Sequence, residues 1–125
     1  MKIEFLPAGA DASPLIRLFH FRPDEAEWLH QACRMLADGE STVVALHDQP
    51  WVESVNGCRL ERRATSEDAG VTMPAHAEPF VLALSSEGWR EVEGKLVQLL
   101  TDPRGWNWLT NDGDVRVLFS RSGHW

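Results

Sequence analysis

The chain has 125 residues, of which 43% are hydrophobic and 25% are charged, and its formal net charge is −7. This length predicts one domain with its own hydrophobic core, which needs no disulfides to fold. The acidic balance argues against binding to nucleic acids or to anionic membrane surfaces, because both recruit proteins mainly through Lys and Arg.

The sequence also argues against membrane insertion and secretion. No stretch reaches the roughly 20 apolar residues that a membrane-spanning helix needs, and the first residues lack the apolar centre of a signal peptide. The two cysteines, Cys33 and Cys58, are too few for a disulfide framework. We therefore expect a reduced, cytoplasmic protein.

The chain begins with residues that favour strands and then a helix. Lys2–Leu6 predicts a short strand that ends at Pro7, and Leu15–Phe21 predicts a second strand, rich in residues that suit a pleated surface. Pro23 opens a helix and Gly39 closes it as a C-terminal cap. Between them, apolar residues recur with the period of an amphipathic helix.

Shorter strands follow this helix. Thr42–Leu46 and Trp51–Val55 predict two of them, separated by a turn at His47–Pro50. The Asn-Gly dipeptide at 56–57 is a strong hairpin signal. We therefore expect the strand predicted at Cys58–Arg63 to pair with the segment that precedes it.

The second half of the chain has a similar order of elements. Residues 64–79 are polar, contain two prolines and predict a long loop between the halves. Phe80–Leu84 predicts a compact buried strand. Ser85 or Ser86 then caps a second amphipathic helix, since either hydroxyl can accept a hydrogen bond from the first turn.

The last part of the chain predicts a hairpin. Trp106–Leu109 and Asp114–Ser120 have strand character, and residues 111–113, Asn-Asp-Gly, supply the turn. Together, these elements predict a single α+β domain spanning residues 1–125. It has a mainly antiparallel sheet with two helices packed on one face, and two βαββ-like halves at about 1–63 and 80–125.

The predicted strands indicate an association surface. Two helices can cover one face of a sheet, and the opposite face is then normally polar. The strands at 15–21, 42–46 and 80–84 are instead apolar on both faces. We expect the helix-free face to form a homodimer or to bind a protein partner. The alternative is that the 64–79 loop and the N-terminal segment cover this face.

His47, Asp48 and Glu53 are candidate ligand-binding residues. His47 and Asp48 lie in the predicted turn, and Glu53 follows shortly after it. Turns often carry site residues, and an imidazole beside carboxylates can bind a metal ion or transfer a proton. Asp48 before Pro50 is also favourable turn chemistry, so the purely structural alternative remains open.

Trp106, Trp108 and Trp125 are candidate interaction residues. Trp106 and Trp108 point to the same side of one predicted strand, and Trp125 must pack on a neighbour if it is to be ordered. Aromatic platforms bind sugars, bases or protein partners. The alternative is that these rings belong to the core.

The sequence predicts no catalytic residue, no resident metal and no cofactor. His30 and Cys33 are three residues apart on the first predicted helix, a spacing that can hold zinc, but no second close pair supplies two more ligands. Arg59, Arg62 and Arg63 form the basic cluster of the sequence. Arg59 and Arg63 share one face of the predicted strand with Glu61 between them, which we interpret as a solvated face with ion pairs. An anionic ligand site is the alternative. No nucleotide-binding or nucleophile motif is present.

The repeated strand–helix–strand–strand order resembles that of the vicinal-oxygen-chelate (glyoxalase-type) proteins, in which paired βαβββ modules form a metal cup. The resemblance implies His and Glu ligands on inner strands. His20 lies inside a predicted strand, whereas the interior of Asp114–Ser120 has no His or Glu. We therefore expect a non-catalytic interaction or self-associating domain. The alternative is a small metal- or ligand-binding enzyme of glyoxalase-like element order, using some of His20, His47, Asp48 and Glu53.

Overall fold

The computed structural model describes residues 1–10, 13–75, 78–102, 105–110 and 113–125. Within these ranges it contains two α-helices and nine strands, which confirms the predicted α+β class. In chain order they are β1 (Lys2–Ala10), β2 (Ser13–Phe19), α1 (Pro23–Asp38), β3 (Val43–Ala45), β4 (Glu53–Ser54), β5 (Leu60–Ala64), β6 (Gly70–Thr72), β7 (Phe80–Leu84), α2 (Ser86–Leu100), β8 (Trp106–Thr110) and β9 (Arg116–Ser120).

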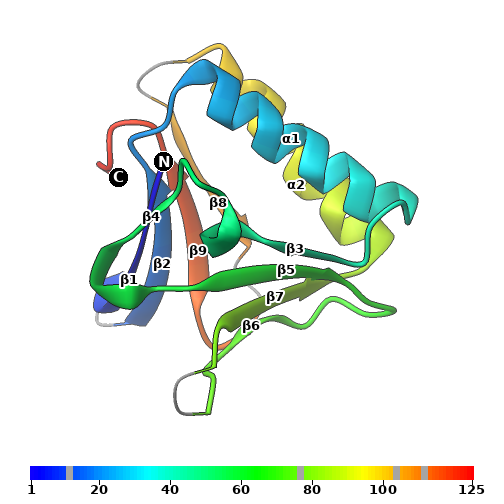
Figure 1. The fold of residues 1–125 in the computed structure, drawn as a ribbon, viewed down its shortest axis with the longest axis horizontal. Coiled ribbons are helices and arrows are strands. Elements are labelled where there is room, and N and C mark those ends of the chain that lie inside the picture. Colours follow the sequence, from blue (N-terminus) through cyan, green and yellow to red (C-terminus); the bar gives the residue numbers. More distant parts are fainter. Residues whose placement is uncertain (11–12, 76–77, 103–104, 111–112) are drawn as a thin grey trace.

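The strands form two sheets. Sheet A has the strand order β4-β1-β2-β9-β8, and sheet B has the order β3-β5-β7-β6. Figure 1 shows α1 and α2 packed side by side over sheet B, with sheet A standing at an angle to it. One main core lies between the helices and the inner faces of both sheets, and Trp89 and Phe119 are among its largest fully buried side chains.

Each sheet takes strands from both halves of the chain. The β1–β2 hairpin and the β8–β9 hairpin form most of sheet A, while β3 and β5 join the β6–β7 hairpin in sheet B. The two central strands are parallel in both sheets: β2 pairs with β9, and β5 pairs with β7. The chain therefore has two βαββ-like halves, β2-α1-β3-β5 and β7-α2-β8-β9. Each half contributes strands to both sheets, so the halves are interlocked and do not form separate sheets.

The helix boundaries agree with the sequence signals. α1 begins at Pro23, and Gly39 ends it with a φ of 77°. Glycine has no Cβ to oppose this left-handed conformation. For α2, Ser85 rather than Ser86 is the cap, because the Ser85 hydroxyl accepts a hydrogen bond from the backbone N–H of Gly88 at 3.2 Å.

The predicted pairing of the strand at Cys58–Arg63 with the preceding segment is wrong. β5 lies antiparallel to β3 and parallel to β7, whereas β4 pairs with β1 in the other sheet. The turn itself forms, since Asn56 and Gly57 have φ values of 52° and 72°. It carries the chain from sheet A to sheet B instead of closing a hairpin.

The predicted loop at 64–79 contains a strand that the sequence did not reveal. β6 pairs antiparallel with β7, and Val71 within it bridges to Val115 just before β9. The carbonyl of Val71 accepts hydrogen bonds from the N–H groups of Asp114 and Val115, at 2.7 and 3.1 Å. These bonds join sheet B to sheet A.

The start of α1 is held by a buried carboxylate. Glu25 Oε1 accepts a hydrogen bond from the N–H of Arg22 at 2.8 Å, and Oε2 accepts one from the Met1 α-amino group at 2.8 Å. Burial alone would raise the pKa of Glu25. The hydrogen bonds from the α-amino group and from Arg22, together with their positive charges, outweigh burial and lower this pKa.

We expect Glu25→Gln to lower the free energy of unfolding by about 1–3 kcal/mol at neutral pH, because a charge-assisted pair becomes a neutral contact. The folded-state pKa of Glu25 lies below its unfolded value. The contribution of Glu25 to the free energy of unfolding is therefore present above the unfolded pKa and is lost as the pH falls through the folded pKa. Urea unfolding at neutral pH and at about pH 3 measures the difference between variant and wild type.

The difference in unfolding free energy between Glu25→Gln and the wild type should be smaller at the lower pH. Glu27→Gln, on the exposed side of the same helix, is the control and should change stability little at either pH. An equal loss for Glu25→Gln at both pH values would contradict the role assigned to its charge.

Gly113 and Gly39 provide a second, matched test of the fold. Both have positive φ, of 80° and 77°, but a Cβ at Gly113 would lie 2.6 Å from the backbone nitrogen of Val71 and even closer to its carbonyl oxygen. A Cβ at Gly39 meets nothing within 4 Å. We expect Gly113→Ala to cost about 2–4 kcal/mol of stability and Gly39→Ala only about 1–2 kcal/mol. Similar losses in thermal or urea unfolding would show that the junction at Val71 tolerates displacement.

Candidate functional site

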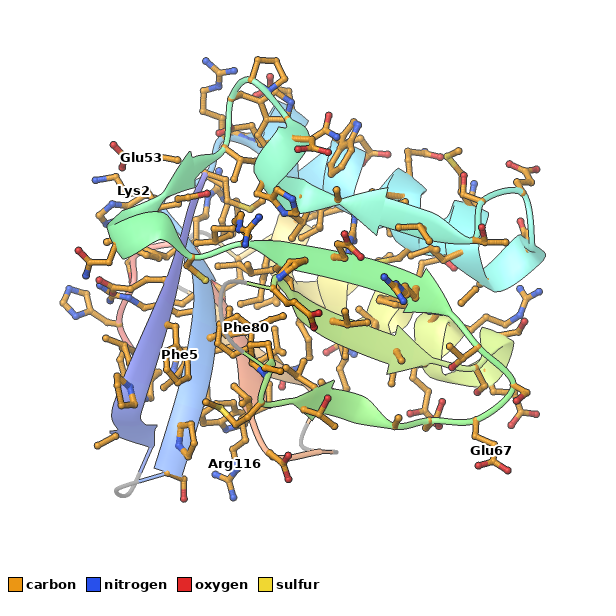
Figure 2. All side chains as sticks on the ribbon, turned by 60° about the horizontal axis from the view of Figure 1, so that its bottom comes forward. Lys2, Phe5, Glu53, Glu67, Phe80 and Arg116 are labelled. Atoms are coloured by element: carbon orange, nitrogen blue, oxygen red, sulfur yellow. The ribbon has the colours of Figure 1, made fainter. Side chains whose placement is uncertain are left out.

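His47 and Asp48 lie together, but Glu53 does not join them. His47 Nε2 lies 3.7 Å from Asp48 Oδ1, and His47 Nδ1 lies 3.3 Å from the carbonyl oxygen of Leu60. Glu53 is on β4, where its carboxylate lies 3.4 Å from Nζ of Lys2, at the edge of sheet A (Figure 2). The structure therefore places an imidazole beside one exposed carboxylate, not a three-residue group.

The histidine that the glyoxalase-like order would use is not within a strand. β2 ends at Phe19, and His20 follows it with a φ of 51° and an exposed side chain. Its Nε2 lies 3.1 Å from the carbonyl oxygen of Ser122. In the described ranges, no group of three or more His, Cys, Asp or Glu side chains is placed to hold a metal ion.

The three candidate Trp residues lie on one surface of sheet A. Trp106 and Trp108 are on the edge strand β8, with ring centroids 6.4 Å apart. Trp108 pairs with Leu118, and Leu118 pairs with Arg17, so their side chains share the outer face, away from the main core. Trp125 reaches the same face, since its ring centroid lies 5.8 Å from the guanidinium carbon of Arg17.

Arg116 completes this surface, because its guanidinium carbon lies 5.4 Å from the ring centroid of Trp108. Trp106 and Trp125 remain 46% and 44% exposed. Both cation–π contacts are within the distance at which such pairs attract. We call the following five residues the Trp–Arg surface: Arg17, Trp106, Trp108, Arg116 and Trp125.

The chain itself covers part of the outer face of sheet A. Leu15 and Leu118 are fully buried there, packed against Leu6 and Trp108. The segment 121–125 also lies on this face. By contrast, residues 2–10 form a strand of the sheet, so the cover does not come from the N-terminal segment as the sequence suggested.

Several hydrogen bonds hold the segment 121–125 in place, and two of them come from side chains of β2 and β9. Arg17 Nη1 donates to the carbonyl oxygen of Gly123 at 3.0 Å, and the Ser120 hydroxyl donates to the carbonyl oxygen of His124 at 2.6 Å. The first bond fixes the guanidinium that also faces Trp125. Trp125 therefore belongs to an ordered segment, so less conformational entropy is lost when its ring binds a partner.

Arg62, a member of the basic cluster of the sequence, is buried. Its side chain is only 2% exposed and points from β5 toward the helices. Nη1 donates to Cys33 Sγ at 3.3 Å, while Nε and Nη2 have no hydrogen-bond partner among the described residues. Strand alternation could have revealed this position, because Arg62 shares its face with the buried Leu60.

Two Trp rings surround the guanidinium. The Arg62 guanidinium carbon lies 5.6 Å from the ring centroid of Trp28 on α1 and 6.0 Å from that of Trp89 on α2. The indole N–H of Trp89 donates to the carbonyl oxygen of Arg63 at 2.9 Å. Arg62 therefore contacts both helices from the centre of sheet B, and burial lowers its pKa.

The thiols are poor nucleophiles in this fold. Burial raises the pKa of Cys33, and the nearby Arg62 opposes this only in part. Burial, with a smaller contribution from Glu4, raises the pKa of Cys58 to about 11. Because the thiolate is the reactive form, both side chains are mostly neutral and unreactive near neutral pH.

His30 lies between the two helices. It is buried against α2, where its Nε2 lies 3.3 Å from Glu93 Oε1, without the alignment of a hydrogen bond. The same carboxylate oxygen accepts a hydrogen bond from Arg34 Nε at 3.2 Å. His30, Arg34 and Glu93 thus link the two helices.

Among the hollows on the described surface, two are of similar size. One, of about 200 Å³, lies beside α2 and is lined mainly by polar side chains, among them Asp68, Glu91 and Lys95. Asp68 is already occupied there, because it accepts hydrogen bonds from the N–H and hydroxyl of Ser85. Lys95 also donates to the carbonyl oxygen of Leu109.

The second hollow, of about 220 Å³, lies where the two sheets meet. Phe5 of β1 and Phe80 of β7 face one another there, with ring centroids 4.8 Å apart (Figure 2). Val55 and the buried Cys58 also line it. No sequence motif marks this hollow, because its two aromatic walls come from different halves of the chain.

The fold and these features define a small α+β protein of two interlocked halves. Comparison with models of known protein families, with curated proteins and with solved structures found no match to this chain. In the part of the chain that the structure describes, neither helix has the length and apolar character to cross a membrane.

The environment of Arg62 leads to a prediction about stability. A buried cation without a carboxylate carries a desolvation cost that an apolar side chain of similar volume does not. We expect Arg62→Met to leave stability unchanged or to raise it by about 1–2 kcal/mol. Arg62→Ala should lower it by about 2–4 kcal/mol, because it leaves a cavity between Trp28 and Trp89.

Urea unfolding of both variants tests this comparison. If Arg62→Met proves as destabilising as Arg62→Ala, then the contacts of the guanidinium with Cys33 and the two Trp rings outweigh its desolvation. In that case Arg62 would contribute to stability through its charge rather than through its volume.

Proposed function

We propose that this protein is a non-catalytic interaction domain that forms a homodimer through the Trp–Arg surface. The observation that carries the proposal is the exposure of Trp106 and Trp125, 46% and 44%, on the helix-free face of a sheet. Large aromatic side chains dominate the binding energy of protein interfaces, and monomeric proteins rarely expose them together.

The composition of this surface favours a second copy of the chain as the partner. In a twofold interface, each surface contacts the same surface of the other subunit, so it must be self-complementary. The Trp–Arg surface offers aromatic rings and guanidinium groups together, and these attract one another. The Glu4 carboxylate lies 2.7 Å from Arg17 Nη2 and balances its charge, which limits the repulsion between two such surfaces.

The position of the surface supports the same proposal. β8, which carries Trp106 and Trp108, is an edge strand of sheet A. An edge strand offers unpaired backbone groups on one side, and neighbouring chains can use these in association. The aromatic rings would then lie beside the new backbone contacts, at the centre of the interface.

The test is the molar mass in solution by light scattering after size-exclusion chromatography, over a wide range of protein concentration. We expect the wild type to reach twice the 14.1 kDa of one chain. The double variant Trp106→Ala/Trp125→Ala should associate at least about tenfold more weakly, because both rings act as anchors.

Val97→Ala is the matched control, since Val97 is 47% exposed on α2, which is not part of sheet A's outer face. It should dimerise like the wild type. A wild type that stays monomeric at every concentration would overturn the homodimer and direct attention to a different protein partner. Dimerisation of the double variant with unchanged affinity would show that another surface is used.

A further inference from the structure

We propose that the hollow between the two sheets binds a small, uncharged aromatic molecule. This site is independent of the Trp–Arg surface, because Phe5 and Phe80 belong to the main core side of the sheets. The hollow is lined by residues from β1, from the turn at 55–57, and from the segment that leads into β7.

The size of the hollow suits a single substituted ring. Its volume is about 220 Å³. An apolar protein cavity of roughly 150 Å³ holds one benzene molecule, so this hollow has room for a ring and one or two small substituents. It is too small for a nucleotide or a typical cofactor, whose pockets start at roughly 300 Å³.

The walls favour an aromatic ligand. The rings of Phe5 and Phe80 are only partly buried and are tilted by 40° to one another. They thus leave ring faces and edges open to the hollow, and Val55 and Cys58 extend the apolar lining. A planar ring can pack against such a pair edge-to-face or offset-stacked, geometries that aromatic groups prefer.

The polar groups around the hollow favour a neutral molecule. Arg59 and Glu78 both line it, so it carries one positive and one negative side chain. A net charge on the ligand would be attracted by one and repelled by the other. Cys58 stays a neutral thiol, because burial raises its pKa. The amide of Asn56 can donate and accept a hydrogen bond, which suits one polar substituent on the ring.

The other hollow is of similar size but differs in its lining. Its lining is mainly charged or polar, and Asp68 and Lys95 are already hydrogen-bonded within the protein. An aromatic ligand there would have to displace these bonds without replacing them, which costs free energy. We therefore assign the ligand to the hollow at Phe5 and Phe80.

Phenol is the probe for the test, because it is one ring with one hydrogen-bonding group and is uncharged at neutral pH. Saturation-transfer NMR should show phenol bound to the wild type. Val55→Trp fills the hollow and should weaken binding at least about tenfold, whereas Val97→Trp adds the same ring on the exposed face of α2 and should not.

Two charged molecules of similar size test the neutrality of the site. Benzoate and benzylamine should each bind at least about threefold more weakly than phenol, because each must desolvate its charge while one positive and one negative side chain of the hollow offset one another. Tighter binding of either ion than of phenol would overturn the assignment of a neutral ligand. Absence of a phenol signal from the wild type would overturn the site.

A second measurement does not depend on any variant. Cys58 lines the hollow, so bound phenol should slow its alkylation by N-ethylmaleimide at mildly alkaline pH, with the modified residue located by mass spectrometry. The protection should saturate as phenol is added. Alkylation of Cys58 at an unchanged rate with phenol in large excess would show that the hollow does not bind it, even if Val55→Trp fails to fold.

Discussion

Parallel pairing between the two halves of the chain determines how the helices and both sheets are arranged. Both sheets are centred on such a pair, β2 with β9 and β5 with β7. Because each half supplies strands to both sheets, the two helices are brought side by side over sheet B. The same arrangement leaves the outer face of sheet A without a helix, and it opens a hollow where the sheets diverge.

Arg62 shows how this arrangement places a charge inside the protein. The helices approach sheet B closely enough for Trp28 and Trp89 to face the guanidinium from two sides. Cys33 provides a weak acceptor rather than a carboxylate. The negative ring faces stabilise the cation and replace part of the hydration that it loses on burial. The flat guanidinium also stacks on aromatic rings better than an ammonium group does. This cluster joins α1, α2 and β5 in one contact network.

Local signals in the sequence were sufficient for the parts of the fold that depend on neighbouring residues. The ends of α1 follow from Pro23 and Gly39, and the shared side of Trp106 and Trp108 follows from strand alternation. The partners of a strand are not encoded locally. The turn at 56–57 has hairpin geometry, yet β4 and β5 separate because each finds a longer partner in a different sheet.

The candidate sites show the same contrast between features that depend on neighbouring residues and features that depend on the whole fold. His47 and Asp48 are neighbours in the sequence and remain neighbours in space, while Glu53, five residues further on, belongs to the other sheet. The hollow at Phe5 and Phe80 could not be inferred from spacing, since these residues meet only after both halves have folded. A three-residue strand such as β6 also lies below what periodicity can detect, because pairing with β7 rather than its own pattern defines it.

The interlocked halves have a consequence for how the molecule reaches its native state. Leu15 pairs with Arg116, so the centre of sheet A cannot form until almost the whole chain is present. A growing chain that has completed β5 holds only β4, β1 and β2 of sheet A and β3 and β5 of sheet B, so the edges of β2 and β5 are still uncovered. Long-range parallel pairing of this kind slows folding, because the loop-closure entropy is lost before the contacts form. During synthesis, those edges are where misassembly between copies would begin.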